Sequence, residues 1–117
     1  MEGVVGMAFD SELAERIRDA LAPEPTLEER KMFGGLAFLI DGRMAVAARG
    51  GGGLMVRVDP ADAPGLVETT SAEYVEMRGR PMKGWLHVDV RDIESEEALD
   101  SWIGRAVSYT ATVTETS

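Results

Sequence analysis

The sequence predicts an α+β fold, a two-layer α/β sandwich in which helices cover one face of an antiparallel sheet. An amphipathic helical pattern occurs near each end of the chain, and apolar runs joined by glycine-containing turns lie between them. The expected order of elements is α-β-β-β-α-β-β-α. A chain of 117 residues can bury one hydrophobic core, so we expect a single domain over residues 1–117 with its core at about 10–109.

The first and last elements are predicted to be helices. Either Asp10 or Ser11 can cap the first helix, and Leu13 and Ile17 begin its apolar stripe. Pro23 ends this helix because proline cannot continue the hydrogen-bond ladder. The closing helix begins near residues 92–95, and its expected buried stripe comprises Leu99, Trp102, Ile103, Ala106 and Thr110.

Three strands are predicted after the first helix. The pair Asp41-Gly42 separates the apolar runs 36–40 and 43–48, and such a pair favours a hairpin whose turn residues both have positive φ. A loop of four glycines over 50–53 then leads into a strand at 54–58. A phosphate-binding loop would instead lead into a helix, so we interpret these glycines as a hairpin connection.

A short helix is expected after Asp59-Pro60, followed by strands at 74–78 and 85–90 that alternate with period two. The loop between these strands carries three cations and no acid. Guanidinium groups beside a lysine can bind a phosphate or a carboxylate, so this loop is a candidate anion-binding site. The alternative is that its cations pair with the acidic helices of the same chain. The three residues are Arg78, Arg80 and Lys83.

The formal net charge is -9, and it is distributed unevenly. Residues 1–29 hold eight acids against two bases, whereas residues 30–58 hold five bases against one acid. The overall negative charge argues against a general affinity for nucleic acid, which proteins bind through an excess of positive charge. The basic middle of the chain is nevertheless compatible with a local anion-binding surface.

No pattern in the sequence indicates an enzyme. The chain has no cysteine and one histidine, His87, which excludes thiolate and multi-histidine metal sites and a Ser-His-Asp triad. We therefore expect no catalytic residues, no metal and no cofactor. No apolar run approaches the roughly 20 residues that span a bilayer, and the N-terminus lacks a signal-peptide pattern. We expect a cytoplasmic protein that does not contact a membrane.

Alternation along the strands divides the predicted sheet into two faces. We expect the more uniformly apolar set, which includes Leu39, Met44, Val46, Val75 and Met77, to meet the helices. The opposite set mixes aromatic, methionine and arginine side chains, which are enriched in interface cores. It predicts a protein-binding or self-association surface, although scattered apolar residues on a solvated face are the alternative. The candidate interface residues are Phe38, Ile40, Arg43, Met55, Arg57, Tyr74, Trp85 and His87.

Several short motifs, each present once, follow one another in a characteristic order along most of the chain. They are Lys31–Leu36 (KMFGGL), Asp41–Met44, Leu54–Asp59, Gly79–Met82 with Trp85, and Ala98–Trp102. Together these blocks resemble the TfoX N-terminal domain family over about residues 10–109. The resemblance implies a two-layer α/β sandwich with the order α-β(3)-α-β(2)-α, which agrees with the pattern of elements above.

Members of that family such as TfoX, also called Sxy, are bacterial regulators of competence genes that carry a separate C-terminal domain. We expect this chain to correspond to the N-terminal module alone. The resemblance implies no catalytic residues. We expect a regulatory or adaptor domain that contacts an unidentified protein partner, with a homodimer as one option. The alternative is a nucleic-acid or nucleotide-binding module that uses Arg43 and Arg57 together with the basic loop.

Overall fold

The computed structural model describes residues 10–32 and 34–113, so residues 1–9, Phe33 and 114–117 lie outside the description that follows. It contains a six-stranded sheet with the strand order β1-β2-β3-β4-β6-β5, in which every neighbouring pair is antiparallel. The elements are α1 (Ser11–Ala20), β1 (Leu27–Met32), β2 (Gly35–Ile40), β3 (Arg43–Ala48), β4 (Leu54–Arg57), α2 (Ala63–Thr69), β5 (Glu73–Met77), β6 (Arg80–Val88), the 3-10 turn η1 (Val90–Ile93) and α3 (Glu96–Thr112).

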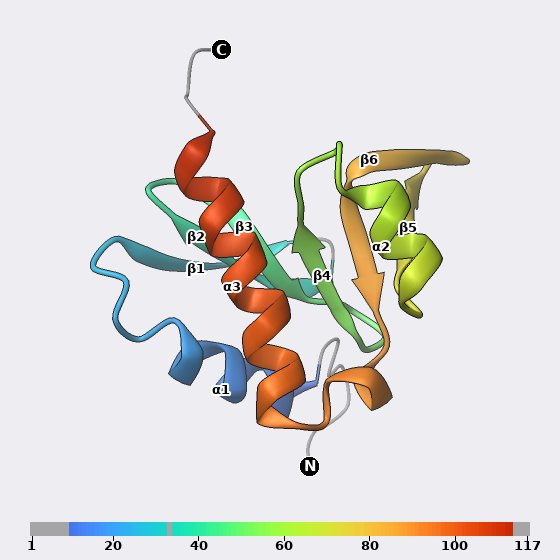
Figure 1. The fold of residues 1–117 in the computed structure, drawn as a ribbon. Helices are drawn as coiled ribbons and strands as arrows, with labels where there is room; N and C mark the ends of the chain where they lie inside the picture. Colours follow the sequence, from blue (N-terminus) through green and yellow to red (C-terminus); the bar gives the residue numbers. More distant parts are fainter. Residues whose placement is uncertain (1–9, 33, 114–117) are drawn as a thin grey trace.

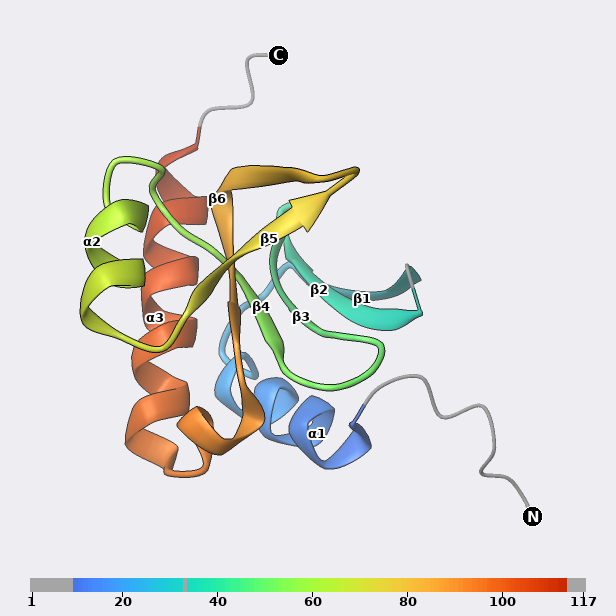
Figure 2. The same cartoon turned by 90° about the vertical axis from the view of Figure 1, so that its right-hand side faces the viewer.

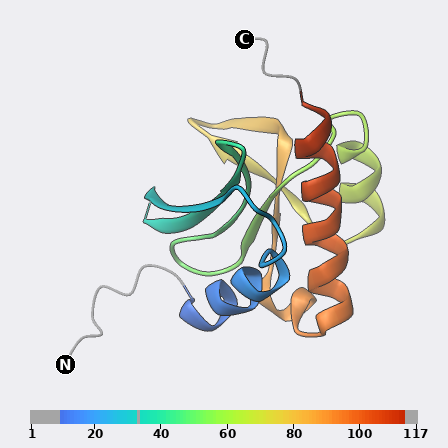
Figure 3. The same cartoon turned by 90° about the vertical axis from the view of Figure 1, so that its left-hand side faces the viewer.

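The predicted α+β class and the predicted order of elements are confirmed. All three helices lie on one side of the sheet, with α3 running across β3 and β4 (Figures 1 and 3). The Asp-Gly hairpin is also confirmed, because Asp41 and Gly42 have φ values of 55° and 79°. The sequence pattern did not predict β1, an edge strand whose middle four residues are charged and exposed.

The main core fills the space between the helices and the sheet. Leu13, Ile17, Leu99 and Ile103 reach it from the helical stripes that the sequence predicted. Asp10 caps α1 by accepting hydrogen bonds from two backbone amides, and Ser95 caps α3 in the same way with one. The sheet contributes Leu36, Phe38, Ile40, Ala45, Val46, Ala48, Leu54, Val56, Leu86 and Val88, and Val58 joins them from just beyond β4.

The predicted division of the sheet into two faces is wrong for β2, because the β2–β3 ladder contains a bulge. Phe38 pairs with Val46 and Leu39 pairs with Met44, which leaves Ala45 unmatched. An extra residue reverses the faces beyond it, so Phe38 and not Leu39 shares the helix-facing side with Val46. Phe38 has 0% exposure and Ile40 has 8%, so neither lies on an open surface.

A second interruption bends β6 and gives the sheet its curvature. Tyr74 pairs with Leu86, but the next residue, Val75, pairs with Met82, so the three residues 83–85 have no counterpart on β5. Beyond this bend the β5–β6 hairpin projects away from α2 and α3. In Figure 2 it lies on one side of a concave face, and β1 and β2 lie on the other. We call this side of the sheet, which faces away from the helices, the concave face.

The basic segment is part of this hairpin and not a loop. Arg78 and Gly79 have φ values of 57° and 80°, so they form a two-residue turn between β5 and β6. Arg80 is the first residue of β6 and pairs with Met77. The second strand therefore begins earlier than predicted, at residue 80 in place of 85, and the cations lie in the turn and at the start of β6.

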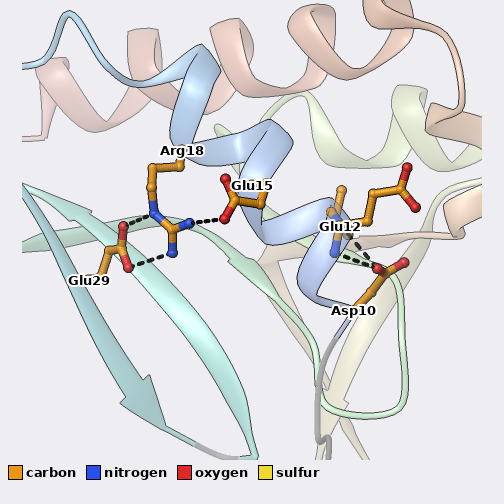
Figure 4. Close-up of polar contacts among 6 residues, drawn as sticks. Asp10, Glu12, Glu15, Arg18 and Glu29 are labelled. Carbon is orange, nitrogen blue, oxygen red and sulfur yellow. Dashed lines mark hydrogen bonds and ion pairs between the residues drawn. The ribbon is translucent and has the colours of Figure 1, made fainter.

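An ion pair joins α1 to the edge strand β1. The Arg18 guanidinium donates hydrogen bonds to both carboxylate oxygens of Glu29, one of them at 2.9 Å, and a third to Glu15 at 3.1 Å (Figure 4). The hydrogen bonds from Arg18 lower the pKa of Glu29 below its ordinary value, and partial burial opposes this only in part. The pair fixes an otherwise exposed strand to the helix layer.

We predict that Glu29→Gln destabilises the domain by about 0.5–1 kcal/mol at neutral pH, the range of a well-oriented surface pair. The folded pKa of Glu29 is lowered, so its contribution is present above the ordinary value of 4.5 and is lost as the pH falls through the folded pKa. Urea unfolding at pH 7 and pH 3.5 measures the difference. Glu28→Gln is the matched control, since Glu28 pairs with Arg30 of the same strand. An equal loss at both pH values would contradict the prediction.

The corrected face of β2 gives a second prediction. Phe38→Ala removes a fully buried ring from the main core and should cost about 3–5 kcal/mol. Met44→Ala, in the neighbouring strand of the same hairpin, should cost less than half as much, because Met44 is only partly buried on the concave face. Chemical unfolding of both variants compares these losses, and similar losses would show that the face assignment is mistaken.

Candidate functional site: a methionine-lined groove

A groove of about 260 Å³ lies on the concave face, between the β5–β6 hairpin and the strands β1 to β4. Its lining comes from all six strands and from the start of the β3–β4 loop. We call it the methionine groove. It is lined by Met32, Gly35, Met44, Ala47, Ala48, Arg49, Gly50, Met55, Val75, Glu76, Met77, Met82 and Trp85.

Every methionine in the described part of the chain lines this groove. Each of the strands β1, β3, β4, β5 and β6 supplies one, so residues spread over 51 positions of sequence meet at one place. Methionine side chains are unbranched and polarisable and adapt to partners of different shape, which makes them frequent at binding surfaces. The five are Met32, Met44, Met55, Met77 and Met82.

The floor of the groove is a small second core. Ala37, Leu39 and Ala47 are buried there, on the side of the sheet opposite the helices. Three of the methionines pack over them and are themselves only partly buried. Met77 on the hairpin is 45% exposed and is one of the two large apolar side chains that are clearly exposed in the described residues. The groove thus presents apolar surface to solvent.

Trp85 forms part of one wall, and its position is fixed by a neighbouring cation. The register places Arg57 opposite Trp85, and the guanidinium carbon lies 5.6 Å from the centre of the indole ring. The same carbon lies 5.7 Å from the ring centre of Tyr109 on α3. Arg57 therefore connects the groove wall to the helix layer through two cation–π contacts.

The β3–β4 end of the groove holds a contact between Arg49 and His87. The Arg49 guanidinium lies 3.1 Å from Nδ1 of His87, and the imidazole ring packs on the backbone of Gly53. A Cβ atom at Gly53 would lie 2.3 Å from the ring, so only glycine fits there. Burial lowers the pKa of His87, and the positive charge of Arg49 lowers it further. The neutral ring can therefore accept a hydrogen bond from Arg49.

Within residues 10–32 and 34–113, the hairpin cations form no ion pair with the acidic helices. Among the residues that the structure describes, no ion pair or hydrogen bond involves the side chains of Arg78, Arg80 or Lys83. The helical acids Glu15 and Glu96 contact Arg18 and Arg16 instead. The alternative in which these cations neutralise the helices therefore does not hold for the described contacts. Their role as an anion site stays a prediction.

The structure separates the predicted interface residues into two groups. Four lie together on the concave face, where Met55 and Trp85 line the groove and His87 and Arg57 contact it from either side. The other four belong to the helix-facing side of the sheet, either because they pack in or against the main core or because of their partner in the strand ladder. These are Phe38 and Ile40 in the main core, Tyr74 against its edge, and Arg43 paired with Ile40.

Sequence reasoning missed four of the five groove methionines. Met44 and Met77 were assigned to the helix-facing set, and Met32 and Met82 were not assigned to a face. The assignment of Val75 to the helix-facing set was also wrong, because Val75 lines the groove and lies outside the main core. A signal was available in the composition, because each of these residues lies in or next to a strand pattern where leucine, isoleucine or valine would be expected. The pattern gave no indication that they converge.

The described residues contain no group of three or more His, Asp or Glu side chains placed to hold a metal ion. No helix among them is long and apolar enough to cross a lipid bilayer. The most distinctive feature is an adaptable apolar groove with polar groups at its ends.

A curved antiparallel sheet with helices on one face and an apolar groove on the other defines a small α+β domain. Residues 19–109, most of the chain, match the model of the TfoX N-terminal domain, and the chain belongs to that family. Comparison with curated proteins gave no match.

The Arg49–His87 contact predicts a pH effect on stability. The folded pKa of His87 lies below the ordinary value of 6.5, so the unfolded chain takes up the proton first as the pH falls. Neutral His87 therefore contributes fully to the free energy of unfolding above pH 6.5, and this contribution is lost as the pH falls from 6.5 to the folded pKa. Urea unfolding from pH 7.5 to 5 should show a decline in stability that is smaller in His87→Gln, whose side-chain oxygen can still accept from Arg49. Parallel pH profiles for the two proteins would refute this assignment.

Proposed function

We propose that this chain is a non-catalytic bacterial regulatory domain that acts by binding a protein partner in the methionine groove. Membership of the TfoX N-terminal domain family supports the regulatory part of the proposal. The groove supports the binding part, and the single observation that carries it is the convergence of all five described methionines around one accessible apolar depression. Competence-type or transcriptional regulation is the process that the family suggests.

The dimensions of the groove favour side chains of a protein over a small molecule. Pockets for cofactors and drug-sized ligands typically enclose roughly 300–1,000 Å³. The methionine groove is smaller, at about 260 Å³, and is partly open to solvent. It suits a few apolar side chains of a partner segment, in the way that grooves bind helices or extended peptides. A second copy of the chain is one source of such a segment.

Binding of nucleic acid is the second candidate function. The absence of described ion pairs at Arg78, Arg80 and Lys83 favours it, because these cations project from the body of the domain. Against it, Arg57 is engaged with two aromatic rings, and Arg43 pairs with a residue of the main core. Arg43 and Arg57 therefore do not extend the basic surface of the hairpin tip, and the apolar groove lies on the adjoining face.

The decisive experiment selects ligands without assuming their identity. A phage-displayed library of random 12-residue peptides is selected on the immobilised full chain, and the enriched peptides are tested against Met77→Asp. We expect at least about tenfold weaker binding to this variant, since a carboxylate in an apolar contact is costly to desolvate. Val90→Asp is the matched control, because Val90 is 37% exposed but does not line the groove.

Methyl NMR locates the binding site independently of mutation. In protein labelled at the methionine methyl groups, an enriched peptide should shift the signals of the groove methionines. The proposal fails if no peptide is enriched. It also fails if enriched peptides bind Met77→Asp as well as they bind the original chain, or leave those methyl signals unchanged. Light scattering after size-exclusion chromatography shows whether a second copy of the chain is itself the partner.

A further inference from the structure

We propose that the methionine groove selects an acidic partner segment, in which one or two bulky apolar residues are flanked by Asp or Glu. This inference rests on the proposed function and specifies the partner at the same site. The apolar residues would contact the methionines and Trp85, and the carboxylates would meet guanidinium groups at the two ends of the groove. Charge complementarity supports this choice of partner, because cations gather around the groove of a protein whose net charge is -9.

One arginine lines the groove beside the β3–β4 loop, and another lies on the hairpin that forms its opposite wall. At the β3–β4 end, Arg49 lines the groove and is half-buried. At the hairpin end, Arg80 pairs with Met77 and so lies on the same face of the hairpin as a groove methionine. Arg78 and Lys83 flank Arg80 along the hairpin and add to the positive charge there. A segment lying in the groove would therefore pass from one cationic group to another.

The contact with His87 prepares Arg49 to bind a carboxylate. The neutral imidazole accepts from one guanidinium nitrogen at 3.1 Å, and Gly53 holds the ring in place. An arginine whose orientation is fixed loses less side-chain entropy when it binds. Its remaining N–H groups can donate to a carboxylate, and such charge-assisted bonds are about twice as strong as neutral ones.

The carboxylates on this side of the domain do not cancel these cations. Glu28 faces the concave side with Arg30 and pairs with it at 3.1 Å. Glu73 lies opposite His87, and Glu76 borders the groove on the hairpin. Cations outnumber carboxylates among the residues that face the groove or form the hairpin tip. They are Arg30, Arg49, Arg57, Arg78, Arg80 and Lys83 against Glu28, Glu73, Glu76 and Asp89, the last of which lies near His87.

The test compares peptides enriched on two charge variants. The first, Arg49→Glu with Arg80→Glu, reverses the charge at both ends of the groove. The second, Lys31→Glu with Arg105→Glu, makes the same change in net charge elsewhere. Lys31 pairs with Leu36 of the main core and so faces the helix side, and Arg105 is an exposed residue of α3.

On the original chain, the enriched peptides should carry Asp or Glu next to Leu, Phe, Met or Trp. A fluorescein-labelled consensus peptide should bind the groove variant at least about fivefold more weakly at 50 mM salt, and the control variant within about twofold. The difference should shrink as the salt concentration rises, because rim charges are screened. Selection on the groove variant should instead enrich Lys or Arg beside the same apolar residues.

Peptides that depend on Met77 but carry neutral or basic flanks would overturn this inference and leave the proposed function standing. The same conclusion follows if both charge variants bind the consensus peptide equally. Failure to enrich any peptide that depends on Met77 would overturn the proposed function itself. A duplex DNA oligonucleotide at 50 mM salt is the final probe. Binding that Arg80→Glu abolishes and Met77→Asp leaves intact would assign the hairpin cations to nucleic acid and so overturn the inference.

Discussion

The concave face of this domain depends on two interruptions in the hydrogen-bond ladder of its sheet. The bulge at Ala45 turns the β2–β3 hairpin, and the unmatched residues 83–85 bend β6. A regular sheet of six strands would twist but keep both faces broadly open. Here both ends of the sheet leave the helix layer on the same side, and a shallow surface becomes a groove between them (Figure 2).

This curvature has an energetic consequence on the side without helices. All six residues of β2 are buried, so the strand needs apolar cover on both faces. The helices cover Phe38 and its neighbours, whereas Leu39 and Ala37 are covered by methionines from adjacent strands. The same side chains therefore shield the second core and form the accessible lining of the groove. A partner that buried the methionines further, as proposed above, would also stabilise the sheet.

Features that depend on local chemistry could be predicted from the sequence. The caps at Asp10 and Ser95, the buried stripes of α1 and α3 and the Asp41-Gly42 turn all follow from residues within a few positions of one another. The strand β1 was missed because its four charged residues favour exposed structure. An edge strand tolerates them, since one side of its backbone and much of its side-chain surface meet solvent.

The face assignment failed where a non-local event decided it. Both sides of β2 are apolar, so alternation offers no polar residue to mark the solvated side. Val46 was correctly placed toward the helices. Regular pairing through the hairpin, without a bulge, then placed Leu39 on the same face as Val46. The structure places Phe38 there instead. Nothing in the run of small and apolar residues over 43–48 indicates which residue forms the bulge.

The candidate site could be predicted only in part for the same reason. Met55, Arg57, Trp85 and His87 were grouped correctly because they pair directly across β4 and β6. The other methionines join them through the curvature of the sheet. Burial of a methionine costs about 1.5–2 kcal/mol of side-chain entropy, compared with about 0.5–1 for leucine or isoleucine. A face that only needed cover would be better filled by leucine or isoleucine. Half-exposed methionines keep much of that freedom, so their use here is more consistent with a surface that rearranges around a partner than with a second static core.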